Sequence, residues 1–183
     1  DQTLSATGSV TNSGVIAAQG NTTITANSLS SRAASVVGAG IKTDGSLINN
    51  ASSTSGNLSV TTTQGLAANG QNLAAGNISL TGESIDLSGS QTSATNVAIT
   101  TAGNFSSAQA TVVASQNLNV ASADLINAGG TLAAGQAANL QTAALNNDGG
   151  LIQTGADLTI NTHGQTLTNT NAANYTNSNA ALN

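Results

Sequence analysis

Side chains that could carry acid–base chemistry are few and scattered in this sequence. It has seven carboxylates, one histidine, two basic residues and no cysteine. Enzymes that cleave polysaccharides need paired carboxylates, often with Arg or Lys, converging on one face. Only Glu83 with Asp86, and Lys42 with Asp44, are close in sequence; the other acids are Asp1, Asp124, Asp148 and Asp157. We therefore expect solvated surface charges, no catalytic residues and no enzymatic activity.

The sequence also predicts no metal or cofactor site. His163 stands alone in Asn-Thr-His-Gly, without a second histidine or a neighbouring acid, so we expect a surface or turn residue. Asp148-Gly-Gly150 is similar to calcium-binding turns, but those recur every nine residues and this one does not recur. Cysteine-based ligation is excluded because the chain contains no cysteine.

The composition narrows the possible partners. The net charge is −5, and Arg32 and Lys42 are the only basic residues, so a nucleic-acid partner is not expected. No apolar run approaches the roughly 20 residues of a membrane span. Aromatic residues make up 1% of the chain, as Phe105 and Tyr175, whereas carbohydrate-binding faces usually expose aromatic rings. Ala, Thr, Asn and Ser number 32, 26, 24 and 22, so small side chains dominate.

These side chains are carried by an internal repeat of about 20 residues. Blocks that open with Asn or Asp followed by two alternating apolar residues begin at Asn57, Asn77, Asn96, Asn117 and Asp157. The spacing continues upstream to Asp1 and Asn21, and the block Asn139–Thr142 looks shifted by about two residues. We interpret 21–40 as a full repeat and 41–56 as a shortened repeat, which gives nine repeats.

Each repeat contains three groups of apolar residues separated by Gly- and Asn-rich corners. The first group alternates with period two, as in Leu58 and Val60, which places both side chains on one face of a strand. The second group comprises Val10, Leu29, Leu47, Leu66, Ile85, Phe105, Leu125, Leu145 and Leu167. The third comprises Ile16, Val37, Leu73, Val113, Leu132 and Ile152.

Three short strands per repeat predict an all-β fold, a right-handed, three-sided parallel β-helix of about nine coils. One repeat cannot bury its apolar face alone, whereas stacked repeats bury it against one another. We expect β-helix repeats over 1–168, with a short coil at 41–56. Residues 169–183 lose the alternation, so we expect there a frayed final coil or, alternatively, a cap in which Tyr175 covers Leu167.

Three further expectations follow from the stacking. Phe105 should point inward beside small residues such as Ala108 and Ala123. Of the six Asn-x-Ser/Thr triplets, those at Asn57 and Asn77 should form a corner ladder of stacked amides; the others begin at Asn21, Asn50, Asn104 and Asn174. An ice-binding face would need stacked Thr-x-Thr pairs. We expect no such array, because the positions that we align with Thr61 and Thr63 hold Thr81 and Glu83, Thr101 and Gly103, and Ala121 and Ala123.

The segments Leu145–Ile160 and Leu125–Gly135, with their Leu-Asn-x-Gly-Gly and related cores, resemble the filamentous-haemagglutinin repeat of bacterial two-partner-secretion exoproteins. This resemblance implies a β-helical stalk of an adhesin or a contact-dependent growth-inhibition effector, secreted to the bacterial cell surface. It implies an outer-membrane transporter as partner during export, and a target-cell or host receptor bound by other regions. A carbohydrate-binding or polysaccharide-degrading β-helix is the alternative. The open coil edges predict end-to-end self-association of the fragment.

Overall fold

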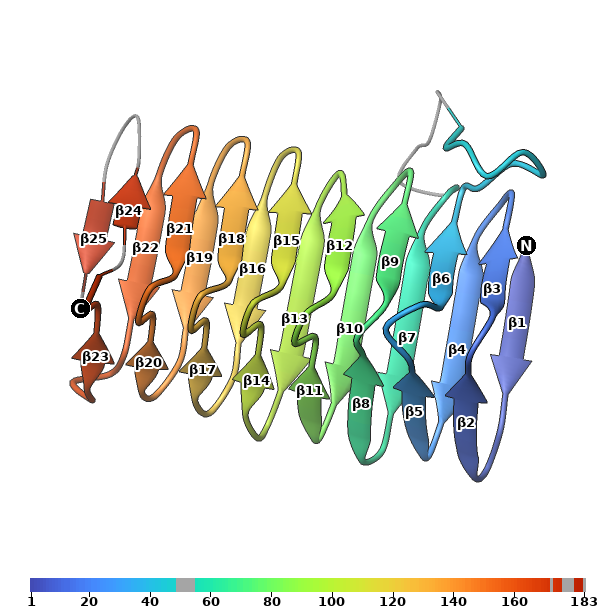
Figure 1. The fold of residues 1–183 in the computed structure, drawn as a ribbon, viewed down its shortest axis with the longest axis horizontal. Coiled ribbons are helices and arrows are strands. Elements are labelled where there is room, and N and C mark those ends of the chain that lie inside the picture. The colour runs from blue at the N-terminus through green and yellow to red at the C-terminus, as the bar shows by residue number, and fades with distance from the viewer. Residues whose placement is uncertain (49–54, 172, 176–179, 183) are drawn as a thin grey trace.

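The protein is an all-β solenoid made of three parallel sheets (Figure 1). The computed structural model describes residues 1–48, 55–171, 173–175 and 180–182. Within these residues, each coil contributes one strand to each sheet, and strands of successive coils pair in parallel. The structure is the three-sided parallel β-helix that the repeat predicts.

Sheet A contains the strands that open each repeat. The alternating apolar residues are the first and third residues of a strand and point inward. In the third and fourth coils they are Leu58, Val60, Ile78 and Leu80, which are all buried. The strands are β1 (Gln2–Ser5), β4 (Thr22–Ala26), β7 (Leu58–Thr62), β10 (Ile78–Gly82), β13 (Val97–Thr101), β16 (Leu118–Ala121), β19 (Ala138–Gln141), β22 (Leu158–Asn161) and β25 (Ala180–Leu182).

The block around Asn139 is in register with its neighbours rather than shifted. Ala138 pairs with Leu118, and Leu140 pairs with Val120. Ala138 thus occupies the position that holds leucine in the preceding coil, which is why the sequence pattern looked displaced.

Sheet B carries the second apolar group. The strands pair Val10, Leu29, Leu66, Ile85, Phe105, Leu125, Leu145 and Leu167 in one column, as predicted for all but Leu47. The strands are β2 (Ser9–Asn12), β5 (Ser28–Ser31), β8 (Gly65–Ala68), β11 (Ser84–Asp86), β14 (Phe105–Ser106), β17 (Leu125–Ile126), β20 (Leu145–Asn146) and β23 (Leu167–Thr168).

Sheet C carries the third apolar group and completes each coil. Its outward faces are uncharged throughout the named strands. The strands are β3 (Val15–Ala18), β6 (Val36–Ala39), β9 (Gln71–Ala74), β12 (Gln91–Ala94), β15 (Thr111–Ala114), β18 (Thr131–Ala134), β21 (Leu151–Thr154) and β24 (Ala173–Tyr175).

Two predicted members of the third apolar group, Leu73 and Val113, do not point into the core. The column that continues Val37 consists of Asn72, Thr92 and Val112, and then of Leu132 and Ile152. Leu73 and Val113 are each one residue further along the strand and therefore lie on its outer face, where they are half-buried. The inward Asn72 donates from its amide to Thr92 Oγ1 at 3.0 Å and to the Ala68 carbonyl at 2.9 Å.

Residues 41–56 do not form the short coil that the repeat analysis predicts. β4 pairs directly with β7, and β6 pairs directly with β9, so no coil lies between the second and third coils. The described residues thus form eight coils, and β25 adds a ninth strand to sheet A alone.

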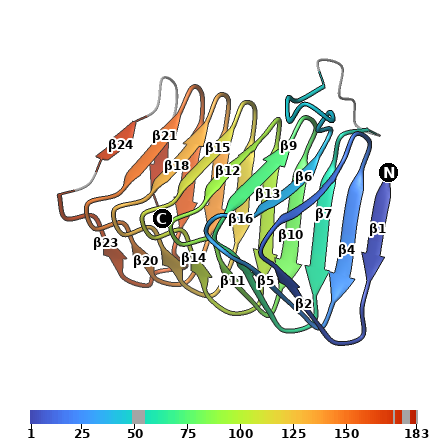
Figure 2. The same ribbon diagram turned by 45° about the vertical axis from the view of Figure 1, so that its right-hand side comes forward.

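Residues 41–48 instead project from the solenoid at the corner between sheets C and A (Figure 2). Ile41 and Leu47 form an antiparallel bridge, and Leu47 is 38% exposed rather than in the core. A Cβ atom built on Gly40 would lie 3.1 Å from the Cα atom of Gly56, so the two ends of the excursion meet. We call residues 41–48 the excursion hairpin. Residues 49–54 of the predicted short coil lie outside the described residues.

Among the described side chains, one hydrophobic cluster runs through the coils, and Phe105 is its one aromatic member. Phe105 is fully buried, as predicted, and pairs in sheet B with Ile85 before it and Leu125 after it. The expected small neighbours Ala108 and Ala123 are only half-buried. They lie at corners of the coil, so the stacked aliphatic residues surround the ring instead.

The last two strands, β24 and β25, continue the sheets of the solenoid. β24 pairs with β21 and β25 pairs with β22, in the parallel arrangement of the preceding coils. The side chain of Tyr175, which the cap alternative requires, lies outside the described residues. Fraying of residues 169–183 stays a prediction for limited proteolysis.

Candidate functional site

The asparagines that open the repeats form a ladder along the corner before sheet A, as predicted for Asn57 and Asn77. The Asn77 amide donates to Asn57 Oδ1 at 3.0 Å, and the Asn57 amide donates to Asn21 Oδ1 at 3.4 Å. The ladder continues through Asn96 to Asn117 at 2.8 and 3.1 Å. These side chains hold the coils together, so the triplets at Asn21, Asn57 and Asn77 have a structural role.

A second ladder, in which Asn127 and Asn147 are fully buried, lies at the corner between sheets B and C. Asn127 Nδ2 donates to Asn147 Oδ1 at 2.7 Å, and Asn147 Nδ2 donates to Asn169 Oδ1 at 2.9 Å. Ser107 donates to Asn127 Oδ1 at 2.8 Å. This ladder explains the Asn of the Leu-Asn-x-Gly-Gly core, because a buried amide must satisfy its hydrogen bonds within the protein.

Glu83 and Asp86 do not converge on one site. Glu83 is exposed at a corner, while Asp86 is half-buried and accepts the Ser88 N–H at 2.8 Å. Asp44 accepts from both the hydroxyl and the N–H of Ser46, at 2.7 and 2.9 Å. These bonds stabilise the carboxylate and lower the pKa of Asp44 from its ordinary value.

His163 and Asp148 also lie in turns. His163 is exposed with a φ of 51°, and its Nδ1 is 3.1 Å from the Thr142 carbonyl. Asp148 is exposed, and its N–H donates to Asn146 Oδ1 at 3.0 Å. Within the part of the chain that the structure describes, no three His, Asp or Glu side chains gather where they could hold a metal ion.

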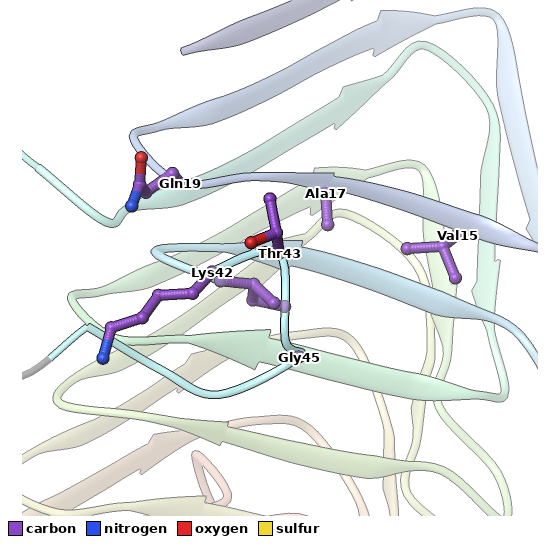
Figure 3. A pocket seen from close by; sticks show the side chains of 7 residues that line it. Val15, Ala17, Gln19, Lys42, Thr43 and Gly45 are labelled. Carbon is purple, nitrogen blue, oxygen red and sulfur yellow. The ribbon is translucent and has the colours of Figure 1, made fainter.

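The excursion hairpin forms an open groove with the outer face of β3 (Figure 3). The groove has a volume of about 440 Å³. Val15 and Ala17 lie on one side, while Lys42, Thr43 and Gly45 come from the hairpin. Val15 is 70% exposed and is the most exposed large hydrophobic residue among those that the structure describes. The groove was not predicted, because residues 41–56 were expected to form a coil within the stack.

The outer face of sheet A carries two rows of mostly hydroxyl side chains over its first five strands. The outward side chains of β1, β4, β7, β10 and β13 pair in two rows across five successive coils. The first row is Thr3, Thr23, Ser59, Ser79 and Ala98, and the second is Ser5, Thr25, Thr61, Thr81 and Thr100. We call these ten positions the hydroxyl plane.

The alignment of Thr61 with Thr63 used the wrong pair of residues, although only β4 carries threonine at both outward positions, Thr23 and Thr25. Thr61 is outward on β7, but Thr63 follows the end of that strand, and its hydroxyl donates to Asn27 Oδ1 at 2.8 Å. The true partner of Thr61 is Ser59, two residues before it. The signal was present in the sequence as hydroxyl residues on both sides of an inward aliphatic residue, as in Thr23-Ile24-Thr25.

The described residues contain no helix of the length and apolar character needed to cross a membrane. A family model described as the haemagglutinin repeat matches residues 1–61, 50–122 and 105–183. No curated protein and no solved structure matches the chain. Since the three matches together span all eight coils, the chain belongs to the haemagglutinin repeat family.

Proposed function

We propose that this chain is a stalk segment of a large secreted bacterial exoprotein and presents a distal receptor-binding or toxin region to other cells. Membership of the haemagglutinin repeat family implies an adhesin-like structural segment of a two-partner-secretion exoprotein. The observation that carries the finer role is the uninterrupted pairing of all three sheets from the first coil to the eighth. Such a solenoid extends by about 4.8 Å with each coil, so its length follows its repeat number.

The proposed partners follow from the same role. An outer-membrane transporter would export the chain, and a target-cell or host receptor would be bound by regions outside these coils. The proposed location is the bacterial cell surface. The alternative, a carbohydrate-binding or polysaccharide-degrading β-helix, receives no support from the site, because Phe105 is buried and the acids of the described coils are separated or bonded in turns.

Removal of whole coils tests the stalk. Deletion of residues 77–116 from the exoprotein joins Gly76 to Asn117 and removes two coils in register. We expect export and target-cell binding to persist, and the maximum dimension of the isolated chain in X-ray scattering to fall by about 10 Å. Deletion of 77–106 is the matched control, because it removes one and a half coils and should prevent folding. Loss of target-cell binding in a folded, exported 77–116 deletion would show that these coils bind the receptor themselves.

We also propose that isolated chains associate end to end. The first coil leaves β1, β2 and β3 with one unpaired edge each, and parallel strands at the other end offer edges of complementary polarity. Gln2 Oε1 is buried there without a hydrogen-bond partner. Sedimentation velocity should show that the average mass increases with concentration. Thr3→Pro, on the edge strand β1, should reduce this increase. A monomer at every concentration would contradict this proposal.

A further inference from the structure

We infer that the excursion hairpin is a proteolytic processing site, cut after Lys42 without separation of the two fragments. Its partner would be a trypsin-like serine protease, whose acidic specificity pocket binds a lysine or arginine side chain. Hydrolysis adds one water molecule to the peptide bond and leaves a carboxylate on Lys42 and an amino group on Thr43. The chain offers such an enzyme only two bonds, because Arg32 and Lys42 are its only basic residues.

The bond between Lys42 and Thr43 lies outside the stack of coils (Figures 1 and 2). It follows the end of β6, and residues 43–47 after it are exposed. Figure 3 shows the Lys42 side chain extending away from Val15 and the outer face of β3. Both the lysine and the bond that follows it are therefore open to an enzyme.

The hydrogen bonds that shape this turn join residues of the hairpin to one another. The Lys42 N–H donates to the Ser46 carbonyl at 2.8 Å, and the Gly45 N–H donates to the Lys42 carbonyl at 2.9 Å. Asp44 accepts from the hydroxyl and the N–H of Ser46. A serine protease binds its substrate as an extended segment, so these bonds must open before cleavage. Their opening leaves the three sheets paired, and such local opening needs much less free energy than unfolding of a coil.

The bond between Arg32 and Ala33 is also exposed, but it is held against the first and third coils. The Arg32 N–H donates to the Asn12 carbonyl of the first coil at 3.0 Å. The Arg32 carbonyl accepts the N–H and the hydroxyl of the buried Ser35, at 2.9 and 2.6 Å. A Cβ atom built on Gly70 of the third coil would lie 2.6 Å from the same carbonyl oxygen. Extension of this corner would separate β5 and β6 from the strands on both sides of them.

The two fragments should stay together because the sheets run across the cut. Residues 1–42 contain β1 to β6, and β4, β5 and β6 pair with β7, β8 and β9 of residues 43–183. Ile24, Leu29 and Val37 of the shorter fragment are buried in the same hydrophobic cluster as the following coils. After cleavage, only noncovalent contacts join the first two coils to the rest of the rod.

Limited proteolysis of the folded chain 1–183 with trypsin tests the site. We expect cleavage after Lys42 to be faster than cleavage after Arg32 by at least about tenfold, because only the hairpin opens without loss of sheet pairing. Mass spectrometry should identify residues 1–42 and 43–183, and size-exclusion chromatography should elute both at the volume of the uncut chain. Heat-unfolded chain should be cut at both bonds at similar rates, which would show that the fold makes the difference.

Variants separate the hairpin from exposure alone. Lys42→Gln should remove the rapid cut, and Thr43→Lys in that background should restore it one bond later. Thr111→Lys is the matched control, because Thr111 is exposed but lies within β15, which pairs with β12 and β18. The lysine at this position should resist trypsin, and circular dichroism melting curves should show that each variant folds.

Cleavage after Arg32 at an equal or higher rate would overturn the inference, and so would resistance of the Lys42 bond in the folded chain. Rapid cleavage of Thr111→Lys within β15 would show that exposure decides and the hairpin does not. Separation of the two fragments on the column would contradict the persistence of the rod. None of these results depends on target-cell binding by the 77–116 deletion, so this inference and the stalk proposal fail separately.

Discussion

The first three coils and the following coils turn from sheet B to sheet C in different ways. In the fourth to seventh coils, seven positions always separate the inward residues of the two sheets, as from Leu125 to Leu132. In the first three coils the separation is six, eight and six, as from Leu29 to Val37 in the second coil. The excursion hairpin also belongs to the second coil.

Constant corner length allows the same turn to recur and its residues to stack. The third residue of the turn has positive φ in each of the later coils: Gly89, Gln109, Gly129, Gly149 and Asn171. Each of the first four donates its N–H to the next coil, as Gly129 does to Asp148 at 2.9 Å. The buried Asn127–Asn147 ladder depends on this register. Regularity of the corner, more than regularity of the strands, therefore decides which columns of side chains can form.

The largest effect should come from the core of the regular region. Phe105→Ala should lower the free energy of unfolding by about 3–5 kcal/mol, because it leaves a cavity where the ring was fully buried. Val10→Ala, in the same column but half-buried in the first coil, should cost about 1 kcal/mol. Denaturant melts measure both. A loss below about 1 kcal/mol for Phe105→Ala would contradict the packing described here.

Breaking the buried ladder should have the next largest effect. Asn127→Ala removes the partner of Ser107 and Asn147, and the unsatisfied polar groups should cost about 2–3 kcal/mol. Ser31→Ala removes the equivalent residue of the second coil, whose hydroxyl bonds only Asn12 and Ser35, and should cost about 1 kcal/mol. Equal losses in chemical denaturation would show that corner regularity adds nothing to the ladder.

Relief of strain at the recurring turn should give a smaller, opposite effect. Gln109 has a φ of 55° at a position where the neighbouring coils have glycine. Gln109→Gly should therefore raise the free energy of unfolding by about 0.5–1 kcal/mol. Ala108→Gly, one residue earlier and outside the left-handed region, should lower it by a similar amount. Thermal unfolding of the two variants should shift in opposite directions; shifts in the same direction would contradict the strain argument.

Removal of the excursion should have the smallest effect on the fold. Deletion of 41–55 joins Gly40 to Gly56, which already lie side by side, and should change the free energy of unfolding by no more than about 1 kcal/mol. Deletion of the 15 residues 81–95 is the matched control and should prevent folding, since it removes most of a coil. In the intact chain, residues 41–48 should exchange their amide hydrogens faster than β6 and β7. A deletion of 41–55 that unfolds the protein would restore the short-coil hypothesis.

Much of the fold could be predicted because the repeat fixes the inward positions of individual strands. Ile24, Leu58 and Leu118 are buried as the period-two pattern requires, and the ladder at Asn57 and Asn77 follows from equivalent positions in stacked coils. The outward partner of Thr61 was misplaced by four residues, at Thr63 instead of Ser59, and the groove was not predicted because 41–56 had been assigned to the stack. Both errors concern where a strand ends.

The three-sided solenoid follows from the amino-acid sequence, since short apolar strands spaced over 20-residue repeats can be buried only by stacking. The sequence also determined the composition of the faces, because period-two alternation separates inward aliphatic residues from outward hydroxyls. Only the tertiary structure decided that Val112 rather than Val113 faces the core, and that the chain between Gly40 and Gly56 leaves the stack. Parallel hydrogen bonds between coils set the register of the strands, and they tolerate corners of different length. Similarity between repeats in the sequence does not reveal where a corner gains or loses a residue.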